Sequence, residues 1–318
     1  MTSLQRTAVQ PRRWTLHGLN NGLLFRSTVR GVTTLPRPVS YAIGHAGTWL
    51  AWRLMPQSND AVAHNLSAIF PGEAPAQLRA RALNTYRAYA RDTIDFLRAL
   101  EASPAELEAL FEIPDVTRTV FTELEKKGRG FLLVTGHYGN WEIGSALMRR
   151  LRLPLTVVAM PEADSDVNEL RREIRDRLGT DTLEVRQSMD TALQIRRRLQ
   201  EGRSVALLMD RHIGRDRVQV QFLGRQAWFL RTPAVLARLS GAPMVPCFIE
   251  RTGPGRFLAL AGAPIHVASD GDRDAAIAEA TQRFAAALET RVRTHPEYWY
   301  HFYRYWDAQA DAYRPEQV

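Results

Sequence analysis

The feature that most constrains the fold is a short apolar run that leads into a helix. Residues 131–135 (Phe-Leu-Leu-Val-Thr) have the length and composition of a buried strand. Asn140 is a favourable N-cap residue, and Ile143, Leu147 and Leu151 follow at four-residue spacing on one apolar face. The pattern therefore predicts a buried strand, a short turn at Gly136 and then a helix.

Similar elements alternate along the rest of the chain. Strands are predicted at 155–160, 204–209, 218–222, 244–249 and 257–261, and helices at 75–100, 105–110, 167–178, 189–200, 233–239 and 274–293. Strand and helix in alternation predict an α/β fold, with a mostly parallel central sheet and helices on both faces. Residues 214–222 look half-buried and hairpin-like.

The domain organisation follows from length and composition. With 318 residues and 45% hydrophobic residues, the chain can bury a substantial core. We expect a basic, amphipathic segment at 1–38, one domain at 39–306 and a tail at 307–318. Within that domain we expect a helical part at 39–112, an α/β core at 113–267, and a final helix with an aromatic tail at 268–306.

A histidine and a glutamate lie where the first predicted strand meets its helix. His137 precedes the helix, and Glu142 falls in its first turn. A neutral imidazole can take a proton from a hydroxyl, and a nearby carboxylate can hold the ring. Gly136 and Gly139 let the backbone come close to a ligand, at the end of a strand where α/β sheets bind substrates. The pattern favours a general base, although such a pair can also simply cap or solvate a helix.

The block Gly-His-Tyr-Gly-Asn-Trp-Glu at 136–142 resembles the signature of bacterial lipid A biosynthesis acyltransferases, a family that includes mycobacterial phosphatidylinositol mannoside acyltransferases. Further motifs follow in the family's order over residues 39–306. They are Asn65-Leu66, Phe70-Pro71, Asn168, Arg175, Gly179, Asp210-Arg211, Phe222-Leu223-Gly224, Gly241-Ala242-Pro243, Pro246 and His295-Pro296-Glu297. Tyr303 stands where members of the family commonly carry a histidine.

The resemblance implies transfer of a fatty acyl group from a thioester of acyl carrier protein or coenzyme A to a hydroxyl of a membrane glycolipid or phospholipid. His137 would be the general base and Glu142 its partner. No Ser or Cys stands in a nucleophile elbow, so we expect direct transfer in a ternary complex. The implied location is the cytoplasmic face of the bacterial inner membrane, as a peripheral or monotopic protein.

Five further residues are assigned to substrate binding. The oxyanion of a tetrahedral intermediate needs hydrogen-bond donors, which backbone N–H groups near Gly139 and Asn140 could supply. Arg175 lies on the helix after the next predicted strand, and Arg211 directly follows a strand end, so both could reach a phosphate or the thioester carbonyl. Asp210 could orient Arg211 or a substrate hydroxyl, or could cap a turn.

The charge balance limits the possible partners. The chain has 42 basic and 34 acidic side chains and a net charge of +8, and Lys126 and Lys127 are its only lysines. Such a protein suits anionic lipid headgroups, the phosphates of coenzyme A, an acidic carrier protein or nucleic acid. The basic residues are dispersed and no nucleic-acid module is recognisable, so we expect no nucleic-acid partner.

We expect neither a cofactor nor a metal. The histidines are scattered, and no Cys and His residues have metal-ligand spacing. Cys247 is the only cysteine; it lies in the apolar run 244–249 and is expected to serve in packing. The 136–142 block lacks the G-x-G-x-x-G spacing of dinucleotide-binding oxidoreductases.

The N-terminal region suggests contact with a membrane. No apolar stretch reaches the ~18 residues of a spanning helix, and no signal-peptide core with a cleavage pattern is present, which argues against secretion. Leucines at 16, 19, 23 and 24 nevertheless share one face, arginines at 12, 13, 26 and 30 flank them, and 39–52 is mostly apolar. These helices would lie in the membrane interface or cover an edge of the sheet.

Two other functions stay open on the sequence. A hydrolase of lipid or acyl thioesters could use His137 and Glu142 on water, and it would release free fatty acid instead of acylated lipid. A non-enzymatic basic protein that binds membranes or nucleic acid would also account for the charge. Salt-insensitive partition into liposomes would favour the membrane.

Overall fold

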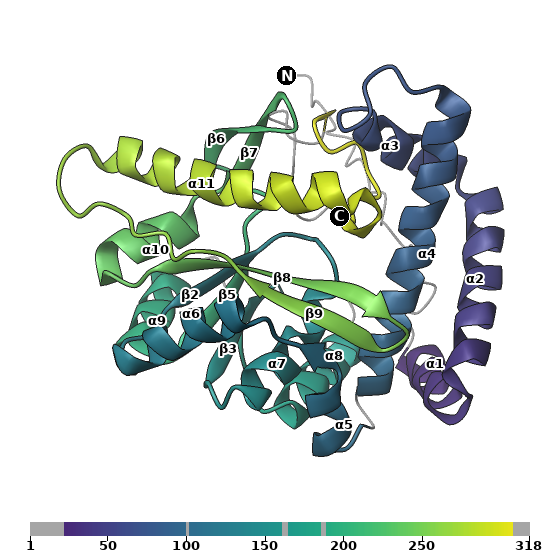
Figure 1. Cartoon of the computed structure of the whole chain (residues 1–318), viewed down its shortest axis with the longest axis horizontal. Coiled ribbons are helices and arrows are strands. Elements are labelled where there is room, and N and C mark those ends of the chain that lie inside the picture. Colours follow the sequence, from purple (N-terminus) through teal and green to yellow (C-terminus); the bar gives the residue numbers. More distant parts are fainter. Residues whose placement is uncertain (1–21, 100–101, 161–164, 186–188, 308–318) are drawn as a thin grey trace, which may run out of the picture.

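A computed structural model describes residues 22–99, 102–160, 165–185 and 189–307. The arginines at 12 and 13, the leucines at 16 and 19, and tail residues 308–318 lie outside this part. The described chain forms an α/β fold around one large sheet, with a two-stranded hairpin beside it (Figure 1). No helix in these ranges is both long enough and apolar enough to cross a bilayer.

The central sheet has seven strands in the order β1-β9-β8-β2-β5-β3-β4. Their bounds are β1 Phe111–Glu112, β2 Leu132–Thr135, β3 Leu155–Ala159, β4 Asp181–Glu184, β5 Ser204–Leu208, β8 Met244–Gly253 and β9 Arg256–Ala261. Every neighbouring pair is parallel except β8 and β9. The predicted mostly parallel sheet is thus confirmed.

Helices cover both faces of this sheet. The helices of the core region are α5 Pro104–Ala109, α6 Asp115–Lys126, α7 Gly144–Arg150, α8 Ser165–Arg177, α9 Met189–Gln200, α10 Thr232–Ser240 and α11 Arg273–Thr294. On β2, Leu132 and Val134 pack into the core that includes α9, α10 and α11, whereas Leu133 packs with α6 and α7. The apolar run 131–135 is buried on both sides, as a central parallel strand requires.

Four N-terminal helices form a separate group. They are α1 Gly22–Thr34, α2 Arg37–Leu54, α3 Pro56–Leu66 and α4 Pro75–Ala99. Helices α1, α2 and α4 lie at one end of the sheet, opposite α9 and α10 (Figure 1). Helix α4 contacts α1, α2 and α3, and also the short turn η2, Pro296–Tyr298, near the end of the chain.

The hairpin of β6 Arg217–Phe222 and β7 Arg225–Leu230 confirms the hairpin-like pattern of 214–222. Its two turn residues, Leu223 and Gly224, both have positive φ, the conformation that tight hairpins use. The backbone N–H of Leu223 donates to Glu289 of α11 at 2.6 Å, which holds the strained leucine in place. The Phe-Leu-Gly motif therefore has a structural reason.

The predicted strands and helices all occur, with ends that differ by a few residues. The sequence did not indicate β1, β4, β7 or α6. Strand β1 has only two residues, β4 is a half-exposed edge strand with polar residues, and β7 is defined by its pairing with β6. Cys247 lies in β8 and packs against the apolar cluster beneath α6, as expected.

Candidate active site

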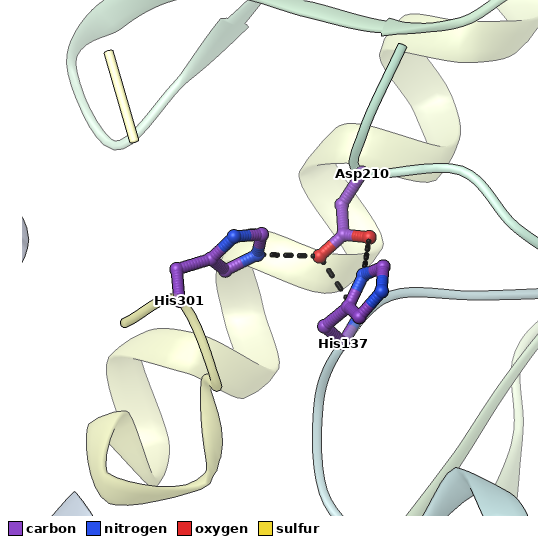
Figure 2. Close-up of side chains that lie close together, drawn as sticks. All are labelled: His137, Asp210 and His301. Carbon is purple, nitrogen blue, oxygen red and sulfur yellow. Dashed lines mark hydrogen bonds and ion pairs between the residues drawn. The ribbon is translucent and has the colours of Figure 1, made fainter. Parts of the chain in front are cut away.

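His137 and Asp210 face each other at the carboxyl ends of two adjacent parallel strands. Strand β2 ends at Thr135 and β5 at Leu208, and these two residues pair in register. His137 and Asp210 each lie two residues beyond the end of their strand, and Nδ1 of His137 is 2.7 Å from Oδ1 of Asp210 (Figure 2). The backbone N–H of His137 also donates to Oδ2 of Asp210, at 2.8 Å.

Asp210 is fully buried between two imidazole rings. Nε2 of His301 lies 2.9 Å from Oδ2, so the carboxylate takes part in three hydrogen bonds (Figure 2). Burial alone would raise the pKa of Asp210, but its hydrogen bonds and electrostatic interactions with the imidazoles of His137 and His301 outweigh it and hold the pKa well below its usual value. An ionised carboxylate only accepts, so both facing ring nitrogens carry the proton.

The hydrogen bond to Asp210 leaves one ring nitrogen of His137 able to accept a proton. With Nδ1–H directed at Asp210, Nε2 is left with the lone pair, and Figure 2 shows this nitrogen pointing away from the carboxylate. Burial and the charge of Arg211 lower the pKa of His137, against the opposite effects of Asp210 and Glu142. The side chain is 16% exposed. The ring is therefore neutral near pH 7 and still accessible.

The sequence did not single out His301. Its pKa is lowered to about 3, mainly by burial, so the ring is neutral, donates to Asp210 from Nε2, and has Nδ1 3.2 Å from the hydroxyl of Tyr303. The resemblance pointed to position 303 for a histidine, and the histidine stands two residues earlier. The sequence signal that could have identified His301 is the occurrence of a histidine within a largely aromatic segment.

Glu142 pairs with an arginine, whereas the sequence predicts it to be the partner of His137. Its Oε2 lies 3.4 Å from Nη2 of Arg175, whose side chain is mostly buried. Glu142 still acts on His137 through its charge, which raises the pKa of the imidazole. The carboxylate bonded to Nδ1 of the ring is that of Asp210, however, and so Asp210 takes the orienting position that the sequence had given to Glu142.

The two glycines around His137 serve close contacts within the protein. A Cβ on Gly136 would lie 3.0 Å from Oδ2 of Asp210 and 2.9 Å from Leu288. Gly139 has φ +60°, and a Cβ there would overlap the carbonyl oxygen of Ile249. Both glycines therefore let Asp210 and β8 approach the loop closely.

The backbone N–H groups proposed for the oxyanion are already used. Gly139 donates to the carbonyl of Tyr298 at 2.9 Å, and Asn140 donates to that of Ile249 at 3.0 Å. The side chain of Asn140 is buried and donates to the carbonyl of Asp92 on α4, so it does not cap the following turn. The turn is a 3-10 helix, η1 Trp141–Ile143, that continues into α7.

Arg211 remains as a donor beside the base. One Nη atom donates to the carbonyl of Tyr300 at 3.2 Å, and the guanidinium lies 5.1 Å from the ring centre of Tyr303. Its Nε is buried without a hydrogen-bond partner among the described residues. Because its charge lowers the pKa of His137, the guanidinium acts directly on the imidazole.

His137, Asp210 and His301 also form a group of potential metal ligands, with one atom of each within 4.8 Å of the others. Their contacts of 2.7 and 2.9 Å join ring N–H groups to a carboxylate, which is the geometry of hydrogen bonds. We find no further group of this kind in the described ranges. In this arrangement the three side chains form a hydrogen-bonded triad.

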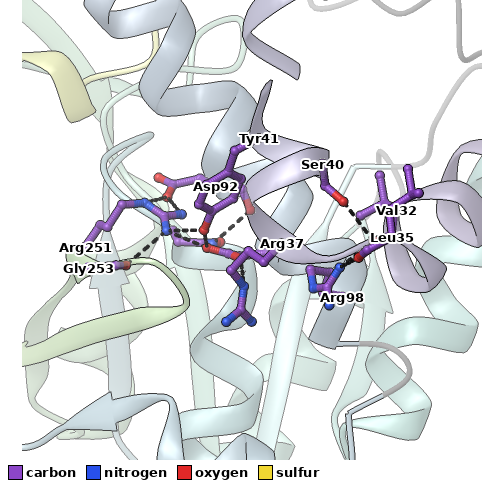
Figure 3. A network of polar contacts seen from close by, with 11 residues as sticks. Val32, Leu35, Arg37, Ser40, Tyr41, Asp92, Arg98, Arg251 and Gly253 are labelled. Atoms are coloured by element: carbon purple, nitrogen blue, oxygen red, sulfur yellow. Dashed lines mark hydrogen bonds and ion pairs between the residues drawn. The ribbon is translucent and has the colours of Figure 1, made fainter. Parts of the chain in front are cut away.

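A buried ionic network attaches the N-terminal helices to the sheet beside the site (Figure 3). Arg251 of β8 pairs with Asp92 and Asp95 of α4, and Arg37 of α2 lies 3.0 Å from Asp95. The second oxygen of Asp92 accepts from the hydroxyl of Tyr300 at 2.6 Å. The network therefore joins α2, α4, β8 and the segment that carries His301.

Comparison with known proteins gives the family. The sequence matches the model of the bacterial lipid A biosynthesis acyltransferases over residues 10–308. It is 25% identical to a phosphatidylinositol mannoside acyltransferase of Mycolicibacterium smegmatis, over 84% of this chain and 91% of the relative. It is 24% identical to the protein of that description from Mycobacterium tuberculosis strain H37Rv, over 95% and 98%. The chain thus belongs to the bacterial lipid A biosynthesis acyltransferase family and is an acyltransferase.

Proposed function

We propose that this acyltransferase moves a fatty acyl group from an acyl thioester to a hydroxyl of a membrane glycolipid, with His137 as the general base. The observation that carries the proposal is the bond of Nδ1 of His137 to the buried carboxylate of Asp210, which leaves Nε2 as the acceptor on an accessible ring. Nε2 removes the hydroxyl proton as the oxygen attacks the acyl carbonyl. Asp210 fixes the tautomer and stabilises the imidazolium that forms.

The proton balance of the reaction is simple. The acceptor O–H bond breaks, an O–C bond forms to the carbonyl carbon, and the tetrahedral intermediate collapses with loss of the thiolate. His137 returns its proton to the sulfur, so the enzyme ends in its starting state. The guanidinium of Arg211 is the donor that we assign to the oxyanion, since the N–H groups of residues 137–140 are bonded within the protein.

Arg175 and Glu142 are assigned a supporting role. Their 3.4 Å contact joins α8 to the turn that follows His137. The negative charge of Glu142 favours the protonated ring and so assists the base during transfer. Either partner can also meet polar groups of a substrate at this edge of the sheet.

The acceptor and the location are inferred together. Two relatives carry the name phosphatidylinositol mannoside acyltransferase, which supports a mannosylated or otherwise glycosylated phospholipid as acceptor. On α2, large apolar side chains face solvent, with Ile43 57% and Leu50 54% exposed, and Arg37 and Arg53 lie near the two ends. A helix of this kind suits the plane of a membrane interface. We therefore propose peripheral binding to the cytoplasmic face of the inner membrane.

The test is acyl transfer by the purified protein. Radiolabelled acyl coenzyme A or acyl carrier protein is supplied with vesicles that contain a phosphatidylinositol mannoside, and products are separated as acylated lipid and free fatty acid. His137→Ala should lower the rate of lipid acylation by about two to four orders of magnitude with an unchanged fold. His266→Ala, at an exposed histidine outside the site, is the control. Free fatty acid as the only product would make the protein a hydrolase instead.

A further inference from the structure

A cleft of about 460 Å³ lies where α2, α3, α4 and η2 meet. We call it the arginine cleft, because Arg81, Arg87 and Arg91 of α4 line it, together with His45 of α2 and Glu297 of η2. None of these residues belongs to the triad or to the residues assigned above to substrate binding. A cluster of guanidinium groups in a cleft is a recognition element for phosphate.

The arginines of the cleft are not equivalent. Arg87 and Arg91 are four residues apart, about one turn of α4, and so lie on the same side of the helix. Arg81 is neutralised by Glu73, at 2.8 Å, and lies over the ring of Phe70. Neither Arg87 nor Arg91 has an ion pair among the residues that the structure describes. Glu297 is the one carboxylate among the lining residues, so with Arg81 paired the lining has an excess of one positive charge.

Two buried polar atoms of the cleft have no partner. Nε2 of His45 and Nε of Arg91 are inaccessible to solvent and without a hydrogen bond in the described ranges. Burial and the charges of Arg91 and Arg87 lower the pKa of His45, which places both guanidinium groups close to a neutral ring. An unsatisfied buried polar atom costs about 1–3 kcal/mol. Both side chains line the cleft, so its wall contains polar groups that the fold itself leaves unsatisfied.

The cleft lies at the height of lipid headgroups if α2 rests on a membrane. His45 projects toward the cleft, whereas Ile43 and Leu50 of the same helix are exposed. An interfacial helix sinks its apolar face about 5–10 Å into the boundary between acyl chains and headgroups. A helix is about 10 Å across, so its opposite side stands in the headgroup layer.

The cleft is also connected to the catalytic loop. Glu297 precedes Tyr298, whose carbonyl accepts the N–H of Gly139 at 2.9 Å. Leu66, another lining residue, follows Asn65, whose amide donates to the carbonyls of His301 and Tyr303. A headgroup bound in the cleft would therefore rest against the same segments that hold His137 and His301.

We propose that the arginine cleft binds the phosphate of an anionic phospholipid headgroup, with Arg87 and Arg91 as donors to the phosphate oxygens. A phosphodiester carries one negative charge, which matches the excess charge of the cleft. Asn84 and Glu297 offer hydrogen-bonding groups for headgroup hydroxyls. The assignment deepens the proposed function and rests on it for the choice of a lipid over another phosphate ester.

The experiment measures binding to vesicles in the absence of any acyl thioester. Its result therefore does not depend on whether the protein transfers acyl groups. Arg87→Gln/Arg91→Gln is compared with the unchanged protein on phosphatidylcholine vesicles with and without phosphatidylinositol. We expect the affinity for the anionic vesicles to fall by at least about tenfold, with little change on neutral vesicles. Arg87→Lys/Arg91→Lys keeps the charges and should recover much of the binding, which guards against misfolding as the cause.

The matched control is Arg118→Gln/Arg129→Gln. It removes the same charge from exposed positions on and just after α6, at the other end of the sheet from α2 (Figure 1). The control should change the affinity by less than about twofold. Equal losses in the two double variants, or unchanged binding by Arg87→Gln/Arg91→Gln, would overturn the proposal. A higher KM for acyl coenzyme A with unchanged vesicle binding would assign the cleft to the donor's phosphates and would also overturn it.

Discussion

Asp210 shares one of its carboxylate oxygens between the backbone N–H of His137 and the imidazole of His301. The oxygen accepts at 2.8 Å from the first and 2.9 Å from the second, while its other oxygen accepts from Nδ1 of His137. A single buried charge thus positions both the ring and the main chain of His137. The roles of Asp210 and His301 can therefore be tested with separate variants.

Asp210→Asn should nearly abolish turnover. An amide can donate to Nδ1 of His137, which would place the ring proton on Nε2 and remove the base. By analogy with hydrolase triads, kcat should fall by about four orders of magnitude. The measurement is single-turnover transfer of labelled acyl groups, with the fold checked by circular dichroism. Asp270→Asn, at an exposed carboxylate, should retain full activity, and a tenth of normal activity in Asp210→Asn would contradict the assignment.

His301 acts as a positioning residue. His301→Leu removes the donor to Oδ2 of Asp210, and we expect kcat to fall by up to about 100-fold with little change in KM. His301→Gln keeps an N–H donor and should recover most of the loss. The acid limb of the kcat/KM profile should shift to higher pH in His301→Leu, because a carboxylate with one donor fewer binds the imidazolium of His137 more strongly. Equal activities of the two variants would refute this role.

Stability should decline on acidification. The pKa of His301 is about 3 in the folded protein, against an ordinary value of 6.5 in the unfolded chain, so unfolding takes up a proton between these values. The contribution of neutral His301 to the free energy of unfolding is fully present above pH 6.5. It is lost as pH falls toward 3, by at most about 1.4 kcal/mol per pH unit. Urea unfolding at about pH 7.5 and about pH 5.5 should show a smaller loss for His301→Gln than for the unchanged protein. Equal losses of stability in His301→Gln and in the unchanged protein would argue against a neutral, buried His301.

Gly139→Ala should destabilise the protein severely. The added Cβ would overlap the carbonyl oxygen of Ile249 in a left-handed backbone, so we expect a loss of at least about 3 kcal/mol in the free energy of unfolding. Gly224→Ala is the control, because its φ of +76° is similar and no atom lies within 4 Å of the new methyl group. It should cost only about 1–2 kcal/mol. Similar losses of stability in the two variants would show that the left-handed backbone alone, and not the overlap with Ile249, accounts for the effect of Gly139→Ala.

The apolar face of α2 predicts membrane affinity. Ile43→Asp/Leu50→Asp should lower partition into vesicles by at least about tenfold without loss of stability, because both side chains are already exposed in the folded protein. Val116→Asp/Leu193→Asp changes equally exposed apolar residues on α6 and α9 and should leave partition almost unchanged. Flotation of the proteins with vesicles measures both. A matching decrease in the control would mean that charge, not α2, governs binding.

The architecture could be predicted because its signals are local. The run at 131–135, the four-residue spacing of Ile143 and Leu147 and the alternation of later elements each depend on neighbouring residues. The family could be recognised for the same reason, since its signature is contiguous. Short elements such as β1 escaped prediction because they are defined only by pairing with distant strands.

The partners within the site could not be predicted in this way. Asp210 lies 73 residues from His137, and only the adjacency of β2 and β5 brings them together. Glu142 was favoured because it is near in sequence, yet the helical turn directs it to Arg175. His301 stands in a segment of aromatic residues that indicates packing, and its bond to Asp210 depends on where that segment crosses the sheet.

The ionic network around Arg251 fastens the outer helices α2 and α4 to β8 and to the segment that carries His301. Arg251 and Asp92 are almost wholly enclosed, and Asn140 is bonded to the main chain at Asp92. Removal of one partner from such a network would leave a buried charge unpaired, at a cost of about 3–5 kcal/mol. If α2 rests on a membrane as proposed, Nε2 of His137 lies at a fixed distance from that surface, and we expect the enzyme to acylate hydroxyls at one depth.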